Sequence, residues 1–263
     1  MLGQATVLAG EEFPFPPSVE DFYLPDFFGH QDTFWFTKIT SMIVLAAIVV
    51  ALFFLLSYRK PQLVPTKKQW LAEYAYGFVR DKVSVDMIGK EGVAFAPYLT
   101  CLFCFILVSN LFGIVPILQM SPMSHIAFPA FLALISYLLF NYVGIRKYGF
   151  AKYMKHTLIP PAPWFILPLL IPIEFFSTLI FRPLTLALRL FANLFAGHVI
   201  LLVFTLGGFA MINANALLFP VSLVSWLMAV ALTFLEAFIA ILQAYVFVVL
   251  TTSYIQGALA EGH

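Results

Sequence analysis

The sequence predicts an all-α integral membrane protein, and its composition and its long uncharged runs carry that prediction. Of 263 residues, 62% are hydrophobic and only 10% are charged, whereas soluble domains are about 25% charged. Several uncharged runs reach the roughly 20 residues that a helix needs to cross a bilayer. The formal net charge of +1 gives no basic surface, so we expect membrane lipid and no nucleic acid as partners.

The first 38 residues predict an acidic tail on the outer side of the membrane. Residues 1–31 contain no lysine or arginine, although a secretory signal peptide needs a cationic start. They carry acidic residues and prolines instead, which are typical of a surface segment. We therefore divide the chain into this extracytoplasmic tail, 1–38, and a single membrane domain, 39–263.

The membrane domain begins with one predicted span, 39–58, an uncharged run about 30 Å long as a helix. Arg59 and Lys60 follow it. Residues 66–90 hold many charges, interleaved with apolar residues at helical spacing, such as Trp70, Tyr74 and Phe78. This pattern predicts an amphipathic helix lying in the membrane interface; an ordinary polar loop is the alternative.

A membrane hairpin is predicted next, with arms at 94–118 and 126–144. The stretch from Gly92 to Ile145 contains no formal charge, and prolines punctuate it. Two apolar blocks then follow, 164–207 and 217–257. Each can form about 60 Å of helix, twice the hydrocarbon thickness, so we expect two long and strongly tilted helices.

Lysine and arginine predict the orientation of these elements. Seven lie between Arg59 and Lys90, and four lie between Arg146 and Lys155. The positive-inside rule places both segments on the cytoplasmic side. The N-terminus is then outside and the C-terminus is cytoplasmic.

Arg189 is the most informative residue of the long blocks. Its guanidinium stays charged at any working pH, and a charge at bilayer depth costs at least about 2.5–3.5 kcal/mol. The nearest acidic residue in sequence is Glu174, fifteen residues earlier. Asn193 follows four residues later on the same helix face, whereas His198 points to the other side.

Further polar side chains accompany Arg189, and each has a simpler structural interpretation. Glu236 and Gln243, seven residues apart, share a stripe of the last block. Asn193 and Gln243 can hydrogen-bond between helices, and His198 can be a neutral histidine at the outer interface. Arg182 can pair with Glu174, about two helical turns away. Taken together, ionisable groups inside a membrane indicate an ion pathway, and His198 and Glu236 can both exchange protons.

Metal, redox and cofactor chemistry are not indicated. Cys101 and Cys104 lie in an uncharged membrane run without a second cysteine or histidine pair, so we expect small buried thiols rather than a zinc or redox site. We expect no metal and no cofactor.

Three segments together resemble a known family. The string LALRLFANLFAGH at 186–198 resembles the signature helix of subunit a of F-type ATP synthases. LQAYVFVVLT at 242–251 is similar to the last helix of that family, and PYLT at 97–100 through NLFGIVP at 110–116 is similar to its second span. The match runs in order from the first span onward.

The resemblance implies a stator subunit of a bacterial plasma membrane, not catalytic by itself, with two proton half-channels. Its partners would be a ring of small hairpin c subunits and peripheral-stalk b-type subunits. Arg189 would face the carboxylate of the ring, and the outer half-channel would be lined by Asn193, His198, Glu236 and Gln243.

Two departures from the family pattern concern the ionisable residues. Some bacterial members carry an acid at the position of His198 and a histidine at that of Glu236, so the pair is exchanged here. The stretch from Glu174 to Arg182 is one residue longer than usual, and both residues enter as weaker site candidates. The alternative function is a self-contained proton or ion channel, or a secondary transporter, that uses the same polar groups.

Overall fold

The computed structural model describes residues 38–59, 61–115, 121–158, 166–214 and 218–259. Within these ranges the chain is helical and contains no β-strand, which confirms the all-α prediction. Four of the described helices are long and apolar enough to cross a membrane. Nearly all of the predicted acidic tail lies outside the described residues.

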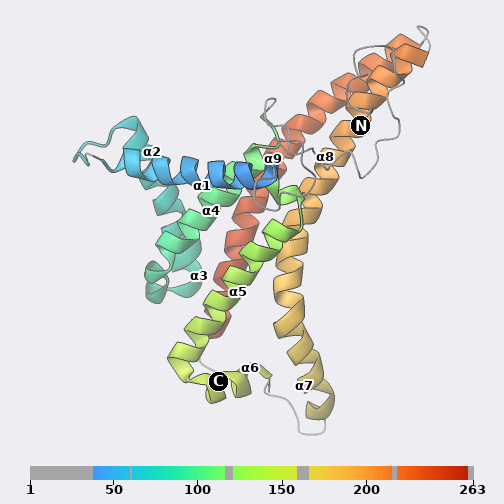
Figure 1. The fold of residues 1–263 in the computed structure, drawn as a ribbon. Helices are drawn as coiled ribbons and strands as arrows, with labels where there is room; N and C mark the ends of the chain where they lie inside the picture. The colour runs from blue at the N-terminus through green and yellow to red at the C-terminus, as the bar shows by residue number, and fades with distance from the viewer. Residues whose placement is uncertain (1–37, 60, 116–120, 159–165, 215–217, 260–263) are drawn as a thin grey trace.

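The helices follow the predicted order with shifted ends (Figure 1). The first arm of the predicted hairpin, α4, is shorter than expected, whereas α5 and α8 extend beyond the predicted 144 and 207. The α-helices are α1 Lys38–Ser57, α2 Lys67–Gly77, α3 Asp86–Ile88, α4 Ala96–Leu111, α5 Ala127–Tyr148, α6 Phe150–Leu158, α7 Leu167–Phe176, α8 Arg182–Ala214 and α9 Phe219–Leu259. Shorter π and 3-10 segments are η2 Phe78–Val85, η3 Lys90–Ala94, η4 Pro122–Ser124 and η5 Ser177–Phe181.

The predicted interfacial segment is helical through α2, η2 and α3, so it is not a polar loop. Thr66 caps its start, because the Thr66 hydroxyl accepts a hydrogen bond from the backbone N–H of Gln69. Trp70 and Tyr74 point outward and stack on each other, with ring centroids 5.4 Å apart. Val79, by contrast, is fully buried in the core. The location of this segment in the membrane interface stays a prediction.

The long helices α8 and α9 lie at a large angle to the first span, α1. In Figure 1, α1 runs across α4, while α8 and α9 extend along a very different direction. Since the 20-residue α1 matches the hydrocarbon thickness when it stands along the bilayer normal, α8 and α9 are then strongly inclined. This arrangement fits their 33- and 41-residue lengths.

The packing of α4 and α5 differs from a simple hairpin. A hydrogen bond between Tyr98 Oη and Ser136 Oγ, 3.1 Å apart, joins them, but both helices pack more extensively against α9. Ala240 and Ala244 of α9 are completely buried, and such small residues allow helices to approach closely in a membrane. The last helix, rather than a neighbouring arm, is therefore the centre of the core.

A short helix, α6, follows α5 where the sequence indicated only a basic cluster. Gly149 has a φ of +78°, which a glycine adopts without strain, and it turns the chain between the two helices. The Tyr153 ring then packs against Gly144, and its hydroxyl donates to Asn141 Oδ1 at 3.0 Å. These contacts hold α6 on the end of α5.

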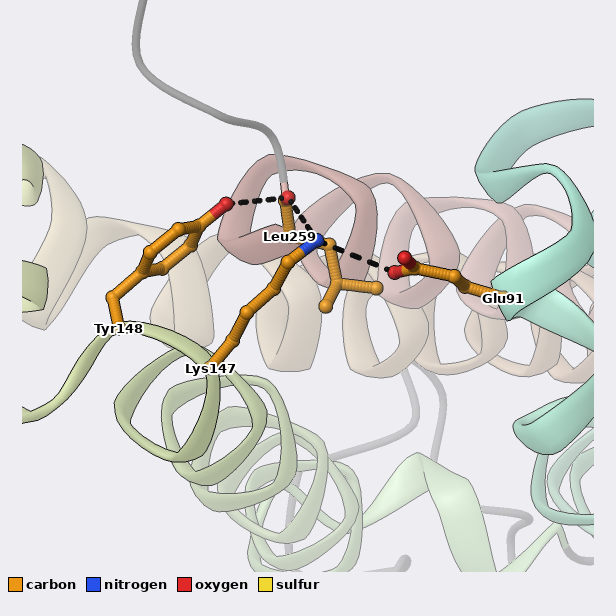
Figure 2. A network of polar contacts seen from close by, with 4 residues as sticks. All are labelled: Glu91, Lys147, Tyr148 and Leu259. Atoms are coloured by element: carbon orange, nitrogen blue, oxygen red, sulfur yellow. Dashed lines mark hydrogen bonds and ion pairs between the residues drawn. The ribbon is translucent and has the colours of Figure 1, made fainter.

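The end of α9 is held by two side chains of α5, one of which also pairs with η3 (Figure 2). The Leu259 carbonyl accepts hydrogen bonds from Lys147 Nζ at 3.1 Å and from Tyr148 Oη at 2.9 Å. Lys147 also pairs with Glu91 at 3.3 Å. Carbonyls in the last turn of a helix have no partner within it, so these donors fix the end of α9 on α5, and Glu91 of η3 holds Lys147 in place.

Candidate functional site

The candidate site is built on α8 and α9, which pack side by side in antiparallel directions. Glycines of α8 lie against large side chains of α9. A Cβ atom on Gly197 would stand 3.6 Å from Glu236 Oε1, and one on Gly208 would overlap the indole of Trp226. The Ser225 hydroxyl adds a hydrogen bond to the Phe204 carbonyl at 2.6 Å. Small residues thus permit the close contact that brings the polar groups together.

A direct hydrogen bond joins two of the predicted site residues. Asn193 Nδ2 donates to Gln243 Oε1 at 2.7 Å, so the interhelical amide contact expected from the sequence is present. Gln243 is only 3% exposed. Its Nε2 is buried and has no hydrogen-bond partner among the described residues. A buried donor of this kind is costly unless another group or a water reaches it.

Glu236 lies about two helical turns before Gln243 on α9. Its side chain is only 7% exposed, and its carboxyl group lies against Gly197. His198, the next residue of α8, is half-buried. The structure therefore brings Glu236 beside the turn of α8 that carries His198.

Arg189 is exposed on the surface of α8. It makes no hydrogen bond or ion pair with any described residue, although Leu190 beside it is fully buried. Asn193 is four residues later and on the same face. The chain thus presents a permanent cation at its surface without a counterion among the residues described here.

The second polar cluster lies at the start of α8. Glu174 Oε1 and Arg182 Nη2 are 3.6 Å apart, which confirms the pair that the sequence suggested, although both side chains are partly exposed. The Thr178 hydroxyl donates to the same carboxyl oxygen at 3.2 Å. The Arg182 guanidinium also lies over the Tyr254 ring of α9, 5.9 Å from its centroid.

The π-helical segment η5 explains how these two residues meet. Eight residues separate Glu174 from Arg182, and in a regular α-helix this spacing would rotate them about 80° apart. A π turn absorbs one extra residue, so their effective spacing becomes about two α-helical turns. The π turn therefore keeps Glu174 and Arg182 in contact despite their eight-residue spacing.

Asn110 was not among the sequence-predicted site residues. It is 1% exposed, and its Nδ2 donates to the Ala240 carbonyl of α9 at 3.2 Å. Its Oδ1 is buried without a partner in the described structure. An amide inside the long uncharged run was the available signal, but the sequence did not indicate that α4 packs on α9 near the site.

The cysteines differ from the expectation of two buried thiols. Cys104 is buried, whereas Cys101 is exposed, because α4 leaves that face open beside α1 and α2. The described residues contain no cluster of side chains able to hold a metal ion.

Comparison with known proteins assigns this chain to a family. Residues 39–256 match the family model described as ATP synthase A chain. The chain belongs to the ATP synthase A chain family. A relative from Nocardioides sp. named ATP synthase subunit a is 44% identical over 261 residues, covering 94% of each chain. A second, from Parafrankia sp., is 48% identical over 230 residues, which is 87% of this chain and 77% of the relative.

A relative of the same name from Streptomyces lividans is 40% identical over 259 residues, covering 98% of this chain and 92% of the relative. The resemblance stated from sequence motifs is thereby confirmed. The A chain described here is a subunit of the membrane sector of an ATP synthase, and its apolar helices accord with a role in ATP synthesis and proton transport.

Proposed function

We propose that this subunit is the stator that provides two proton half-channels and uses Arg189 to couple proton transfer to rotation of a c-ring. Peripheral-stalk b-type subunits would hold it in place. It would make no chemical bond itself and would act only as part of the proton-transporting complex. The observation that carries the proposal is the exposed Arg189 side chain, which has no counterion in the described chain.

The position of Arg189 between two polar clusters supports this role. Arg182 lies about 10 Å before it along α8 and pairs with Glu174 of α7, and the Asn193–Gln243 contact follows about one turn after it. Two polar regions separated by a fixed cation can serve as two half-channels, because the positive charge repels protons and blocks direct leakage between them.

The outer half-channel would run along Glu236, His198, Asn193 and Gln243. Glu236 is buried at the contact between α8 and α9, and Gln243 holds an unpartnered donor. Asn110 faces the same part of α9 and would extend the polar path. Groups that exchange protons and amides that bind water are what such a path requires.

The second half-channel would lie near Glu174 and Arg182. This cluster follows the basic segment 146–155 in the chain and touches Tyr254 near the C-terminal end of α9. Both regions are cytoplasmic by the positive-inside rule. The subunit would then span a bacterial plasma membrane with its N-terminus outside and its C-terminus inside.

The coupling between proton transfer and rotation of the ring follows from elementary electrostatics. A ring carboxyl group facing lipid is neutral, and attraction to Arg189 favours its ionised form, so the group releases its proton there. It binds another proton from the other half-channel after it has passed. Each proton that crosses the membrane releases about 2.3 kcal/mol per 100 mV, which biases rotation of the ring.

The test replaces the cation. Arg189→Ala should abolish ATP-driven proton pumping in membrane vesicles, because no fixed charge would then deprotonate the ring. The assembled complex should remain intact, since Arg189 makes no contact that holds the described fold. Arg146→Ala removes another exposed cation and should leave pumping near normal. Undiminished pumping by Arg189→Ala would exclude the proposed role.

A further inference from the structure

A pocket lies where α1, α2 and α4 meet, away from the polar clusters on α8 and α9. Its volume is about 260 Å³, and it opens on the surface of the molecule. Nearly all of its wall is apolar. The lining residues are Phe54, Tyr58, Tyr76, Pro97, Thr100 and Cys101.

The depth of the pocket is given by the elements around it. Phe54 belongs to the last turn of α1, and Pro97 to the first turn of α4. The stacked and exposed pair of Trp70 and Tyr74 lies on neighbouring α2. Tryptophan and tyrosine gather where the hydrocarbon core meets the headgroups. With α2 in the membrane interface, as predicted, the pocket lies just inside one face of the bilayer, with its inner wall at hydrocarbon depth.

The charge beside the pocket completes a site for an amphipathic molecule. Arg59 follows Tyr58 directly, is exposed, and makes no ion pair with any described residue. A guanidinium binds phosphate oxygens through paired hydrogen bonds. An apolar cavity with an exposed cation one residue beyond its wall suits an acyl chain with a phosphate above it, and does not suit a polar metabolite.

We propose that this pocket binds one acyl chain of a phospholipid from the surrounding membrane, with the lipid phosphate at Arg59. The bound lipid would fill the space between α1, α2 and α4 and so hold the first span against the rest of the molecule. This inference needs only a chain that resides in a membrane, and it does not depend on the role of Arg189.

Cys101 provides a natural probe of the pocket. Its thiol lines the cavity and is exposed, whereas Cys104, three residues later, is buried. A maleimide should therefore react at Cys101 in the intact complex, and Cys101→Ser supplies the control without that thiol.

The first measurement follows alkylation of Cys101 in the delipidated complex. Phospholipid added back should slow the reaction with N-ethylmaleimide several-fold, because the acyl chain covers the thiol. Arg59→Gln should require a higher lipid concentration for the same protection. An alkylation rate that phospholipid does not change would overturn the proposal.

The second measurement counts the lipids retained by the purified complex in native mass spectrometry. Cys101→Trp fills the pocket and should remove one retained phospholipid, whereas Leu45→Trp, at an exposed position of α1 outside the pocket, should not. Equal counts in both variants would contradict the site. Photo-cross-linking from a benzophenone on Cys101 should yield a lipid adduct; a cross-link to another subunit would show instead that a partner helix fills the pocket.

Discussion

The roles of single residues in the candidate site depend on contacts between the two long helices, α8 and α9. The sequence placed Asn193 near Arg189 and Glu236 near Gln243 on separate stripes. The structure joins those stripes through the 2.7 Å hydrogen bond from Asn193 to Gln243. It also sets Glu236 against Gly197, beside His198. The contact of Glu236 with the residue before His198 is the reason to test these two side chains as a pair.

The pairing of His198 and Glu236 can be tested by exchanging them. His198→Glu and Glu236→His should each lower proton flux, since each leaves two like groups where one acid and one base now lie. The double variant should recover part of the flux, because it restores one of each. ATP-driven pumping in vesicles measures this. A double variant no better than the product of its two single losses would argue against a coupled relay.

At the scale of the element, the π segment η5 shows how a helix can align two side chains that regular α-helical geometry would rotate apart. It keeps Glu174 and Arg182 on one side although they are eight residues apart. The eight-residue spacing is visible in the sequence, but a local π turn and a regular helix that rotates the two side chains apart are compatible with the same residues. The geometry of the pair distinguishes them.

Changing the length of η5 tests this explanation. Deletion of Ile180, an exposed residue of the segment, should convert it to regular α-helix and keep the ion pair, so pumping should persist. Insertion of one alanine after Ile180 should rotate Glu174 about 100° away from Arg182 and lower proton flux. Equal damage from deletion and insertion would contradict the proposed absorption of one residue.

The contact between α8 and α9 depends on a close approach at Gly208. Gly208→Val would drive a side chain into the Trp226 indole, and such overpacking typically costs about 1–3 kcal/mol. The thermal midpoint of the purified complex should fall. Gly257→Val is the matched control, because a Cβ there meets no atom within 4 Å. A midpoint that falls equally in both variants would mean that helix propensity, not the interface, dominates.

At the scale of the whole molecule, the core is organised around α9, and the ionisable groups lie on its contact with α8. Arg189 remains exposed there without a counterion in the described chain. A self-contained channel would carry a complete path within one chain, whereas a stator half-channel ends at a site on a ring. The exposed cation favours the second arrangement.

Reconstitution distinguishes these two arrangements. The purified chain in liposomes should show no proton conductance above lipid alone, since protons would need a ring carboxyl to move from one half-channel to the other. Addition of the c-ring and the peripheral stalk should restore a conductance that depends on Arg189. Pyranine fluorescence under an imposed potential measures both cases. Conductance by the isolated chain would support the channel alternative.

The sequence by itself determined the membrane class, the order of the helices, the unusual cation at 189 and the family. Composition, the length of uncharged runs and the spacing of charges can all be read directly from the residues. Only the tertiary structure decided that α4 and α5 pack on α9, that Asn110 joins the site, that η5 aligns Glu174 with Arg182, and that Cys101 opens into a pocket. Helical periodicity tells which residues share a face, but in a membrane every apolar face is compatible with lipid or with protein. Which faces meet is settled by close packing of small residues, such as Gly197 and Ala240, against particular partners.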